Sequence, residues 1–368
     1  MEDGSKFLEL SMGPQHPSTH GVLRLAVRLD GEEVVDCKVD IGYLHRSFEK
    51  FAETWQYPQL APFVDRNDYL AGTLNERAYC LAVERLLGLE VPERAEYIRV
   101  IMAELNRIGS HLIWFGTFAM DLGATTAFLW AFAARERLYD LNEVVTGGRM
   151  FPQFFRLGGV RNDFPPAFFP MVEKTLDELE RSLAEYHGLI SGNPIFLART
   201  KGIGRLSAED ALAYGCSGPM LRGSGIPYDV RKADPYSIYG RFQFDVPVGQ
   251  HGDVYDRYTV RMREIEESIK IVRQALDGYP RRGPVAAKLP RRLKPPEGAH
   301  VYAHVESPRG DLGVFIVSDG TEQPYRIKWR APSFSNLQAV EFLAPGLTVA
   351  DLVALVGSVD VVLGEVDR

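Results

Sequence analysis

The feature that most constrains the fold of this chain is an apolar stripe near residue 100. Apolar side chains recur there at steps of three or four residues: Ile98, Ile101, Leu105, Ile108 and Leu112. This is the period of one helix face, and Pro92 suits the first turn of such a helix. Glu104, Arg107 and His111 line another face. We therefore predict a long helix that packs against neighbours and carries a separate polar stripe.

Three further stretches have helical patterns, at about residues 67–87, 125–145 and 166–189. Together with the first helix they predict an antiparallel bundle. Glycine and proline then interrupt residues 192–254, for which we predict extended, irregular structure. A helical pattern returns at residues 253–276.

Strand patterns lie on both sides of the helical part. Leu23 to Leu29 alternate between apolar and other residues, and Asp30-Gly31 leads into a second alternating run at 35–39, which predicts a hairpin. Three strand-like runs and a helix-like segment follow residue 300: 301–305, 312–317, 325–329 and 349–356. The predicted fold class is α+β, with an N-terminal hairpin or small sheet, a central helical bundle and a C-terminal mixed α/β segment.

The length of 368 residues suggests about two domains or one large domain with insertions. The patterns divide the chain into four regions. Residues 1–45 are β-rich, 46–190 form the bundle, 191–280 combine an irregular segment with a long helix, and 281–368 hold a proline-rich linker and a C-terminal α/β region.

Charge and cysteine content exclude some functions. The net charge of −7 gives the surface as a whole no reason to bind a nucleic acid backbone. Cys37, Cys80 and Cys216 form no C-x-x-C pair, which fits a reducing compartment, and the eight histidines are scattered. We predict no metal site. The first six residues lack the pattern of a signal peptide, and no apolar run reaches the roughly 18 residues of a membrane span.

Two polar stretches are candidates for chemistry. Glycines and prolines force residues 13–21 into a loop that carries His16 and His20, and residues 65–70 form a polar start to an apolar helix. A histidine on this loop and the phenol of Tyr69 could donate hydrogen bonds to the two carbonyls of a flat substrate. From these residues alone the commoner interpretation is local: the histidines bond to turn backbone groups and Asn67 caps a helix.

Asp121 lies in a strongly apolar neighbourhood. If its side chain is buried it needs a partner such as a histidine, because an isolated buried charge is costly. Alternatively, it caps the helix that begins near residue 125. The local sequence leaves both interpretations open.

Several motifs resemble the quinone-site subunit of respiratory complex I, the proton-pumping NADH:quinone oxidoreductase. They extend over essentially the whole chain: GPQHPSTHGVLRL at 13–25, IGYLHR at 41–46, DRNDY at 65–69, MDLGA at 120–124, SGPMLR at 217–222, ESPRG at 306–310 and GEVDR at 364–368. The resemblance implies that His20 and Tyr69 bind the quinone head group and that Asp121 pairs with His20. These are the predicted catalytic residues.

The motifs are also similar to the large subunit of nickel–iron hydrogenases, whose fold the resemblance implies. There, two C-x-x-C pairs hold the metals. The corresponding positions here are Asp68 with Ala71 and Val362 with Glu365, so all four thiolates are absent. Without these soft ligands a nickel–iron site cannot form, and the cavity is expected to serve a quinone.

The resemblance places Arg46 and Arg66 near the terminal iron–sulfur cluster of an adjacent subunit. Many relatives carry a histidine close to that cluster at the position of Phe151. Because a phenyl ring takes no proton, we expect no pH dependence of the cluster potential through this position. The chain itself is expected to hold no covalently bound cofactor.

The resemblance implies a chain that is inactive alone and works with the iron–sulfur subunit and with other peripheral-arm and membrane-arm subunits. It would lie on the cytoplasmic face of a bacterial inner membrane, or the organelle equivalent, attached through its partners. The alternatives are the same subunit in a ferredoxin-dependent, photosynthetic complex I-like enzyme, or a non-catalytic scaffold. Electron donor, quinone type and proton route stay open.

Overall fold

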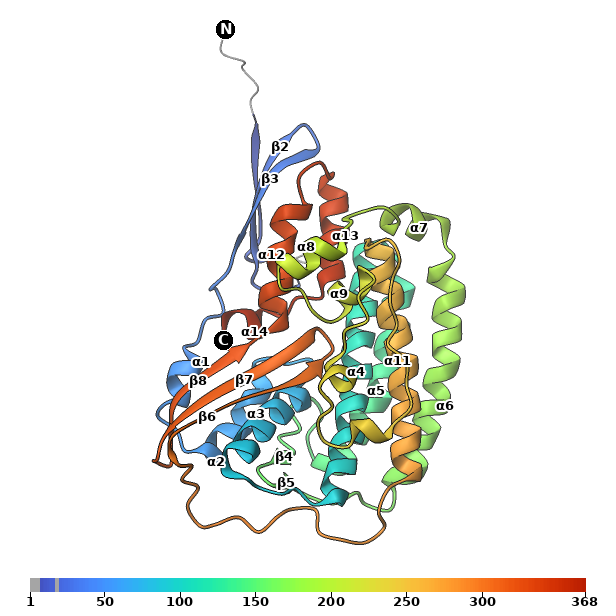
Figure 1. Ribbon diagram of the computed structural model, residues 1–368. Helices are drawn as coiled ribbons and strands as arrows, with labels where there is room; N and C mark the ends of the chain where they lie inside the picture. Colours follow the sequence, from blue (N-terminus) through green and yellow to red (C-terminus); the bar gives the residue numbers. More distant parts are fainter. Residues whose placement is uncertain (1–6, 17–19) are drawn as a thin grey trace.

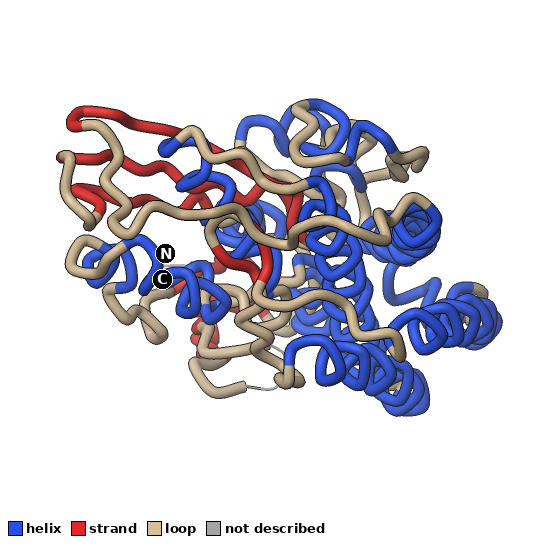
Figure 2. The backbone as a smooth tube through the Cα atoms, turned by 90° about the horizontal axis from the view of Figure 1, so that it is seen from below, coloured by secondary structure: helices blue, strands red, loops and turns tan. Residues whose placement is uncertain are grey.

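The structure is a computed structural model that describes residues 7–16 and 20–368. Residues 17–19 of the candidate loop and the first six residues lie outside the described part. The described residues combine long helices with small antiparallel sheets, which confirms the α+β class. In Figure 1 the long helices stand side by side, and the strands lie to one side of them; Figure 2 shows the same division from below.

The N-terminal sheet contains the predicted hairpin. Its strands are β1 (Leu8–Met12), β2 (Arg24–Asp30) and β3 (Glu33–Asp40), paired antiparallel in the order β1-β2-β3. Leu25, Val27 and Leu29 are buried and alternate with more exposed neighbours, as expected for a strand with one covered face. Strand β1, which extends the hairpin to three strands, was not predicted.

The predicted helices form the core of the molecule. They are α3 (Gly72–Leu87), α4 (Glu93–Asp121), α5 (Thr125–Thr146), α6 (Phe168–Tyr186) and α11 (Val254–Asp277). Helix α4 packs against α5 and α11, so it is covered on several sides. A π-helical turn, η3 (His187–Ser191), extends α6, and a two-stranded ribbon of β4 (Phe155–Arg156) and β5 (Gly159–Val160) precedes it.

The start of α3 differs from the prediction. Helix α1 (Phe48–Ala52), helix α2 (Tyr57–Leu60) and the 3-10 helix η2 (Ala61–Arg66) come first, and residues 67–71 form a turn before α3 begins. The residue at the N-cap of α3 is Ala71, so the capping role considered for Asn67 is wrong. Tyr69 therefore lies in a turn between two helices, because the 3-10 segment ends before the α-helical hydrogen bonding begins.

The segment predicted as irregular contains short helices instead of extended chain. These are α7 (Pro194–Thr200), α8 (Ala208–Ala213), α9 (Pro219–Gly223), α10 (Val230–Ala233) and the 3-10 helix η4 (Tyr239–Arg241). Local capping explains part of the difference. The side chains of Asn193, Ser207 and Asp229 accept hydrogen bonds from the first backbone N–H groups of α7, α8 and α10.

The C-terminal region adds a second three-stranded sheet and three helices. The strands are β6 (Glu297–Ser307), β7 (Gly310–Asp319) and β8 (Pro324–Arg330), and the helices are α12 (Pro332–Leu343), α13 (Val349–Val359) and α14 (Leu363–Asp367). The strands and α13 were predicted, whereas α12 and α14 were not.

The two ends of the chain are packed together. The backbone of Val34 in β3 exchanges hydrogen bonds of 2.8 Å with Leu347 and Gly346. The carboxylate of Asp367 in α14 accepts from the backbone N–H groups of Gly42 (2.8 Å) and Leu44 (2.7 Å). A single apolar cluster also joins the N-terminal sheet to α12, α13 and α14. The C-terminal helices thus lie where they can complete a site that begins near the N-terminus.

The predicted polar stripe of α4 is buried. Arg107 Nε donates to Glu104 Oε2 (3.0 Å), and His111 Nε2 lies 3.0 Å from Glu264 Oε2 on α11. Glu264 also pairs with Arg222. His111 thus joins α4 to α11, and Glu264 in turn joins α11 to Arg222 of α9. In the parts of the chain that the structure describes, no helix is both long and apolar enough to cross a membrane.

Candidate functional site

The structure brings His20 and Asp121 together. His20 Nε2 lies 2.5 Å from Asp121 Oδ2, although 101 positions separate the two residues in the sequence. The two side chains are 13% and 7% exposed, so the pair is largely covered. Asp121 is the last residue of α4, and the N-cap of α5 is Ala124, which has no side-chain cap. The capping alternative for Asp121 is therefore wrong.

His20 has a left-handed backbone, with φ of 54°. This conformation is uncommon for a residue other than glycine, and it directs the side chain away from the path of β2 toward the end of α4. His16 forms an isolated antiparallel backbone bridge with Gly21. The two histidines of this loop thus differ: His16 is exposed, whereas His20 faces Asp121.

Tyr69 is a partly buried phenol with unused hydrogen-bonding capacity. Its hydroxyl group has no hydrogen-bond partner among residues 7–16 and 20–368. Burial raises the pKa of Tyr69, and the nearby carboxylate of Asp68 adds to this effect. The phenol therefore stays protonated at neutral pH and is available as a donor.

Helix α14 connects the surroundings of the two candidate donors. A methyl group added to Gly364 would lie 3.4 Å from Cδ1 of Tyr69, so this ring packs directly on the helix. One added to Gly21, the neighbour of His20, would lie 3.2 Å from Cδ2 of Leu363. Adjacent residues of α14 therefore contact the Tyr69 turn and the His20 loop.

A buried cluster around Arg309 lies behind Tyr69. The Arg309 guanidinium donates to Asp68 Oδ2 (2.8 Å), Asp360 Oδ1 (3.2 Å) and the Asp360 backbone oxygen (2.9 Å). It also donates to Ser110 Oγ (3.2 Å) on α4. The fully buried Glu365 is close enough to interact electrostatically with Asp68 and Arg309. Asp68 and Glu365, the positions where the sequence resemblance leads us to expect hydrogenase thiolates, thus carry carboxylates around an arginine.

This cluster was not predicted as a functional unit. Arg309 occurs in the motif at 306–310, and the resemblance to hydrogenases implies that Asp68 and Glu365 stand at thiolate positions. These two facts were the available signals. Neither shows that residues so far apart in the sequence meet, because that depends on the tertiary fold.

Arg46 and Arg66 lie together at the surface next to the Tyr69 turn. Arg46 donates to the backbone oxygen of Arg66 (3.1 Å), and Arg66 donates to Asp65 Oδ1 (2.7 Å). The Arg66 guanidinium also lies over the rings of Phe63 and Phe151, 5.4 Å and 5.2 Å from their centroids. Phe151 therefore contacts Arg66 through its ring and holds it by a cation–π interaction.

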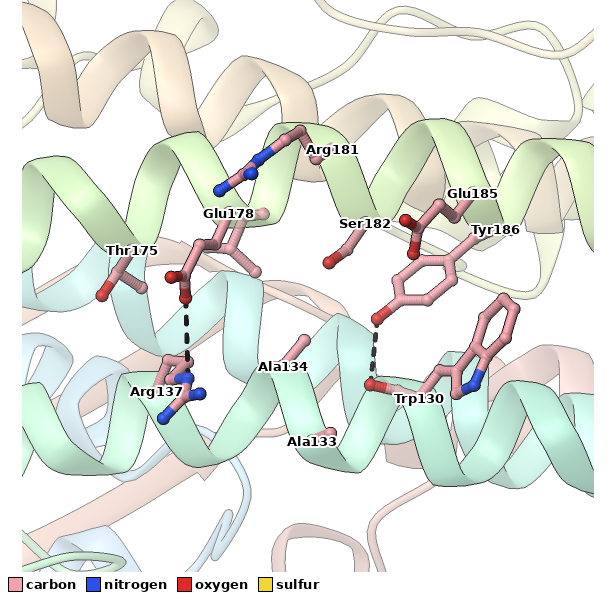
Figure 3. Close-up of a pocket in the computed structure, with 11 residues that line it drawn as sticks. Trp130, Ala133, Ala134, Arg137, Thr175, Glu178, Arg181, Ser182, Glu185 and Tyr186 are labelled. Atoms are coloured by element: carbon pink, nitrogen blue, oxygen red, sulfur yellow. Dashed lines mark hydrogen bonds and ion pairs between the residues drawn. The ribbon is translucent and has the colours of Figure 1, made fainter.

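A surface groove between α5 and α6 is a separate feature. Its volume is about 360 Å³, and Figure 3 shows Arg137 paired with Glu178 across it and the Tyr186 hydroxyl donating to the backbone oxygen of Trp130. None of the predicted site residues lines this groove. In the described part of the chain, no group of three His, Cys, Asp or Glu side chains is arranged to hold a metal ion.

Comparison with known proteins gives a consistent result. The family described as the 49 kDa subunit of respiratory-chain NADH dehydrogenase matches residues 121–300 and 289–368. A D subunit of the NADH-quinone oxidoreductase of Symbiobacterium thermophilum is 53% identical, and 98% of each chain is covered. The D subunit of the same enzyme in Bacillus thuringiensis strain Al Hakam is 51% identical over 97% of this chain and 98% of its own. The chain therefore belongs to the family of the 49 kDa subunit, or D subunit, of respiratory NADH dehydrogenase.

Proposed function

We propose that this chain binds a quinone between the His20 loop and the Tyr69 turn, as a subunit of a proton-pumping NADH:quinone oxidoreductase. The observation that carries the proposal is the pair of unused donors next to α14. The Tyr69 hydroxyl is free to donate, and His20 uses only Nε2 on Asp121 within the described structure. Two such donors match the two carbonyl oxygens of a quinone ring.

Asp121 gives His20 its proposed role. When Nε2–H donates to Asp121, a neutral imidazole has no proton on Nδ1, whereas the imidazolium form carries one there. The Asp121 carboxylate accepts from Nε2–H in either form and so orients the ring; in the imidazolium form Nδ1–H can donate to the substrate. Asp121 thus acts through His20 as a positioning residue.

The proposed reaction adds two electrons and two protons to the quinone. Electrons arrive singly from an iron–sulfur cluster of the adjacent subunit, and His20 and Tyr69 each release one proton to a carbonyl oxygen. The two side chains must be reprotonated before the next turnover. The altered charge of the His20–Asp121 pair is the proposed signal to the proton-pumping part of the enzyme.

The surface around Arg46 and Arg66 is the proposed contact with the iron–sulfur subunit. Phe51 and Phe63 are exposed there, and Trp55 packs against Phe63 with ring centroids 4.4 Å apart. Exposed aromatic rings beside arginine are characteristic of protein interfaces. In this proposal the chain reaches the cytoplasmic face of the membrane through such partners, with no covalently bound cofactor of its own.

Tyr69→Phe in the assembled enzyme tests the quinone site. The phenyl ring keeps the packing on Gly364 but cannot donate, so we expect quinone reduction to fall about 100-fold, within the range for loss of an acid catalyst. Electron transfer to an artificial acceptor that bypasses the site should stay within about twofold of wild type.

The matched control is Tyr325→Phe, since Tyr325 is 66% exposed on β8 and has no place in the proposed site. Both activities should be unchanged in that variant. Unaltered quinone kinetics in Tyr69→Phe would remove Tyr69 from the site and defeat the proposal.

A further inference from the structure

The cluster behind Tyr69 contains more carboxylates than cations. Asp68, Asp360 and Glu365 lie around Arg309, and a second cation among the described residues, Arg261, has its Nε 4.0 Å from Asp360 Oδ2. Three ionised carboxylates and two arginines would leave one negative charge buried. Because an uncompensated buried charge is costly, the cluster is expected to hold a proton near neutral pH.

Hydrogen bonding identifies the carboxylate that holds this proton. Asp68 is well supplied with donors: Oδ1 accepts from the backbone N–H groups of Leu70 and Ala71, both at 3.1 Å, and Oδ2 accepts from Arg309. Asp360 Oδ1 accepts from Arg309, and Arg261 Nε lies 4.0 Å from Asp360 Oδ2, although this oxygen has no hydrogen-bond partner among the described residues. Glu365 has no arginine hydrogen-bonded to it among the described residues; its donors come from Ser333, whose backbone N–H lies 2.9 Å from Oε1.

Glu365 Oε2 is buried and has no hydrogen-bond partner in the described structure. An ionised carboxylate would leave a charged oxygen buried here without a donor, which costs more free energy than burying a neutral carboxyl group. The arrangement therefore suits the neutral form. Burial, together with the nearby Asp68 carboxylate and against the opposing effect of Arg309, raises the pKa of Glu365 to about 7. Glu365 can therefore gain and lose a proton at physiological pH.

Glu365 also lies next to the proposed site. It follows Gly364, on which the Tyr69 ring packs, and Asp68 precedes Tyr69 in the sequence. The electrostatic fields of Asp68 and Arg309 reach both the Glu365 carboxyl and the Tyr69 phenol. One turn and one short helix thus hold the phenol and the carboxyl at the same cluster.

We propose that Glu365 is the proton reservoir of the quinone site, which reprotonates Tyr69 after the phenol has given its proton to the substrate. This inference rests on the proposed function. In the step, the Glu365 O–H bond breaks and a phenol O–H bond forms, directly or through an intervening water. The carboxylate that remains regains its proton from solvent, so no electrons move and no other reactant is needed.

The transfer is favourable in direction. The Tyr69 phenol holds its proton more tightly than an ordinary tyrosine, because its pKa is raised, whereas Glu365 releases its proton near neutral pH. A phenolate at Tyr69 would therefore take the proton from Glu365. Loss of the acid form of Glu365 above about pH 7 should slow quinone reduction.

The experiment compares Glu365→Gln with wild type in the assembled enzyme. Glutamine retains the oxygen that accepts from Ser333 but carries no exchangeable acid proton. In wild type the quinone reduction rate should fall roughly tenfold per pH unit above the Glu365 pKa. In Glu365→Gln the rate at pH 6 should be about 100-fold lower, and this decline with pH should be absent. A wild-type pH profile in this variant overturns the inference.

Glu365→Asp is the second variant, since it keeps a carboxyl with a shorter reach. It should reduce quinone faster than Glu365→Gln and keep a decline with pH, at a shifted midpoint; an unshifted midpoint would also overturn the inference. Activity with the artificial acceptor reports assembly in both variants. Infrared difference spectra across pH 6–8 should show a carboxylic acid carbonyl component in wild type that is missing from Glu365→Gln, beside the component of Glu76 that both proteins share.

The two proposals fail in different ways. If the quinone site is wrong, Tyr69→Phe has normal quinone kinetics. If only the reservoir is wrong, Tyr69→Phe is slow while Glu365→Gln keeps the wild-type rate and pH profile.

Discussion

Arg309 and Tyr69 lie beside the same carboxylate, Asp68, yet they use their polar groups in opposite ways. The Arg309 guanidinium is fully buried and donates to two aspartates and a serine. The Tyr69 hydroxyl is partly buried and, within the described residues, donates to none. The difference separates a group that stabilises the fold from one with capacity left for a ligand. His20 resembles Tyr69 in this respect, since one of its two ring nitrogens is in use.

The strongest test of this comparison is Arg309→Met. Removing the guanidinium leaves Asp68 and Asp360 buried without their main partner, so we expect a loss of about 3–5 kcal/mol in the free energy of unfolding. The change should appear as a lower thermal midpoint and weaker co-purification with the other subunits. Arg326→Met is the control, because this exposed arginine pairs with Glu53 at the surface and should cost less than about 1 kcal/mol.

Asp121→Asn tests the other side of the comparison. The amide keeps the shape of the side chain but removes the negative charge that faces Nε2 of His20. We expect quinone reduction to slow about tenfold, or roughly 1.4 kcal/mol, with little change in thermal midpoint. The pH profile of quinone reduction should also change, and an unaltered profile would count against the role given to the His20–Asp121 pair.

Arg66 is intermediate between the two cases of Arg309 and Tyr69, because aromatic rings and a carboxylate contact its guanidinium group while the side chain stays partly exposed. Phe151→His would place an ionisable ring at the surface proposed for the iron–sulfur subunit, where the present ring centroid lies 5.2 Å from this guanidinium. A reduced cluster favours the protonated ring, so the cluster potential should fall with rising pH, by at most about 59 mV per unit. Potentiometric titration at several pH values measures this. A potential independent of pH in the variant would place the cluster elsewhere.

Glu76 provides the smallest effect and a contrast with the carboxylates near Arg309. Burial raises its pKa to about 8, although the N–H groups of Phe154 and Phe155 donate to Oε2. The folded state holds a proton that the unfolded state has lost, so stability falls as pH rises from about 4.5 to about 8. Glu76→Gln should therefore gain at least about 1 kcal/mol relative to wild type between pH 5 and pH 9, as measured by denaturant unfolding. Parallel stability curves for the two proteins would show that Glu76 does not titrate in this range.

The elements that depend on local periodicity were predictable from the sequence. The alternation from Leu23 to Leu29 and the stripe from Ile98 to Leu112 correspond to β2 and α4. Strand β1 was missed because LELSM is short, and α12 was missed because its apolar residues show little of the one-sided distribution of an amphipathic helix. The turn that holds Tyr69 was assigned to α3, since a 3-10 segment before a helix has a similar pattern.

The candidate site was predictable only through the family resemblance. Local reasoning left the role of Asp121 open between capping and pairing, and His20 is 101 positions away from it. The Arg309 cluster joins Asp68 to Asp360, and their meeting depends on how β6, β7 and α13 pack against α4. Such contacts follow from the whole fold, which periodicity in one segment does not contain.

The packing of α14 between the His20 loop and the Tyr69 turn has a consequence for how the chain folds. Leu363 and Gly21 are separated by most of the sequence, whereas α4 and α5 are neighbours along it. Contacts between close segments form early, and those that close long loops form late. The helical bundle can therefore form before the proposed quinone site is assembled. Such an immature chain would already be largely helical. Completion of the site is therefore better followed by the protection of the Tyr69 backbone N–H from hydrogen exchange than by total helix content.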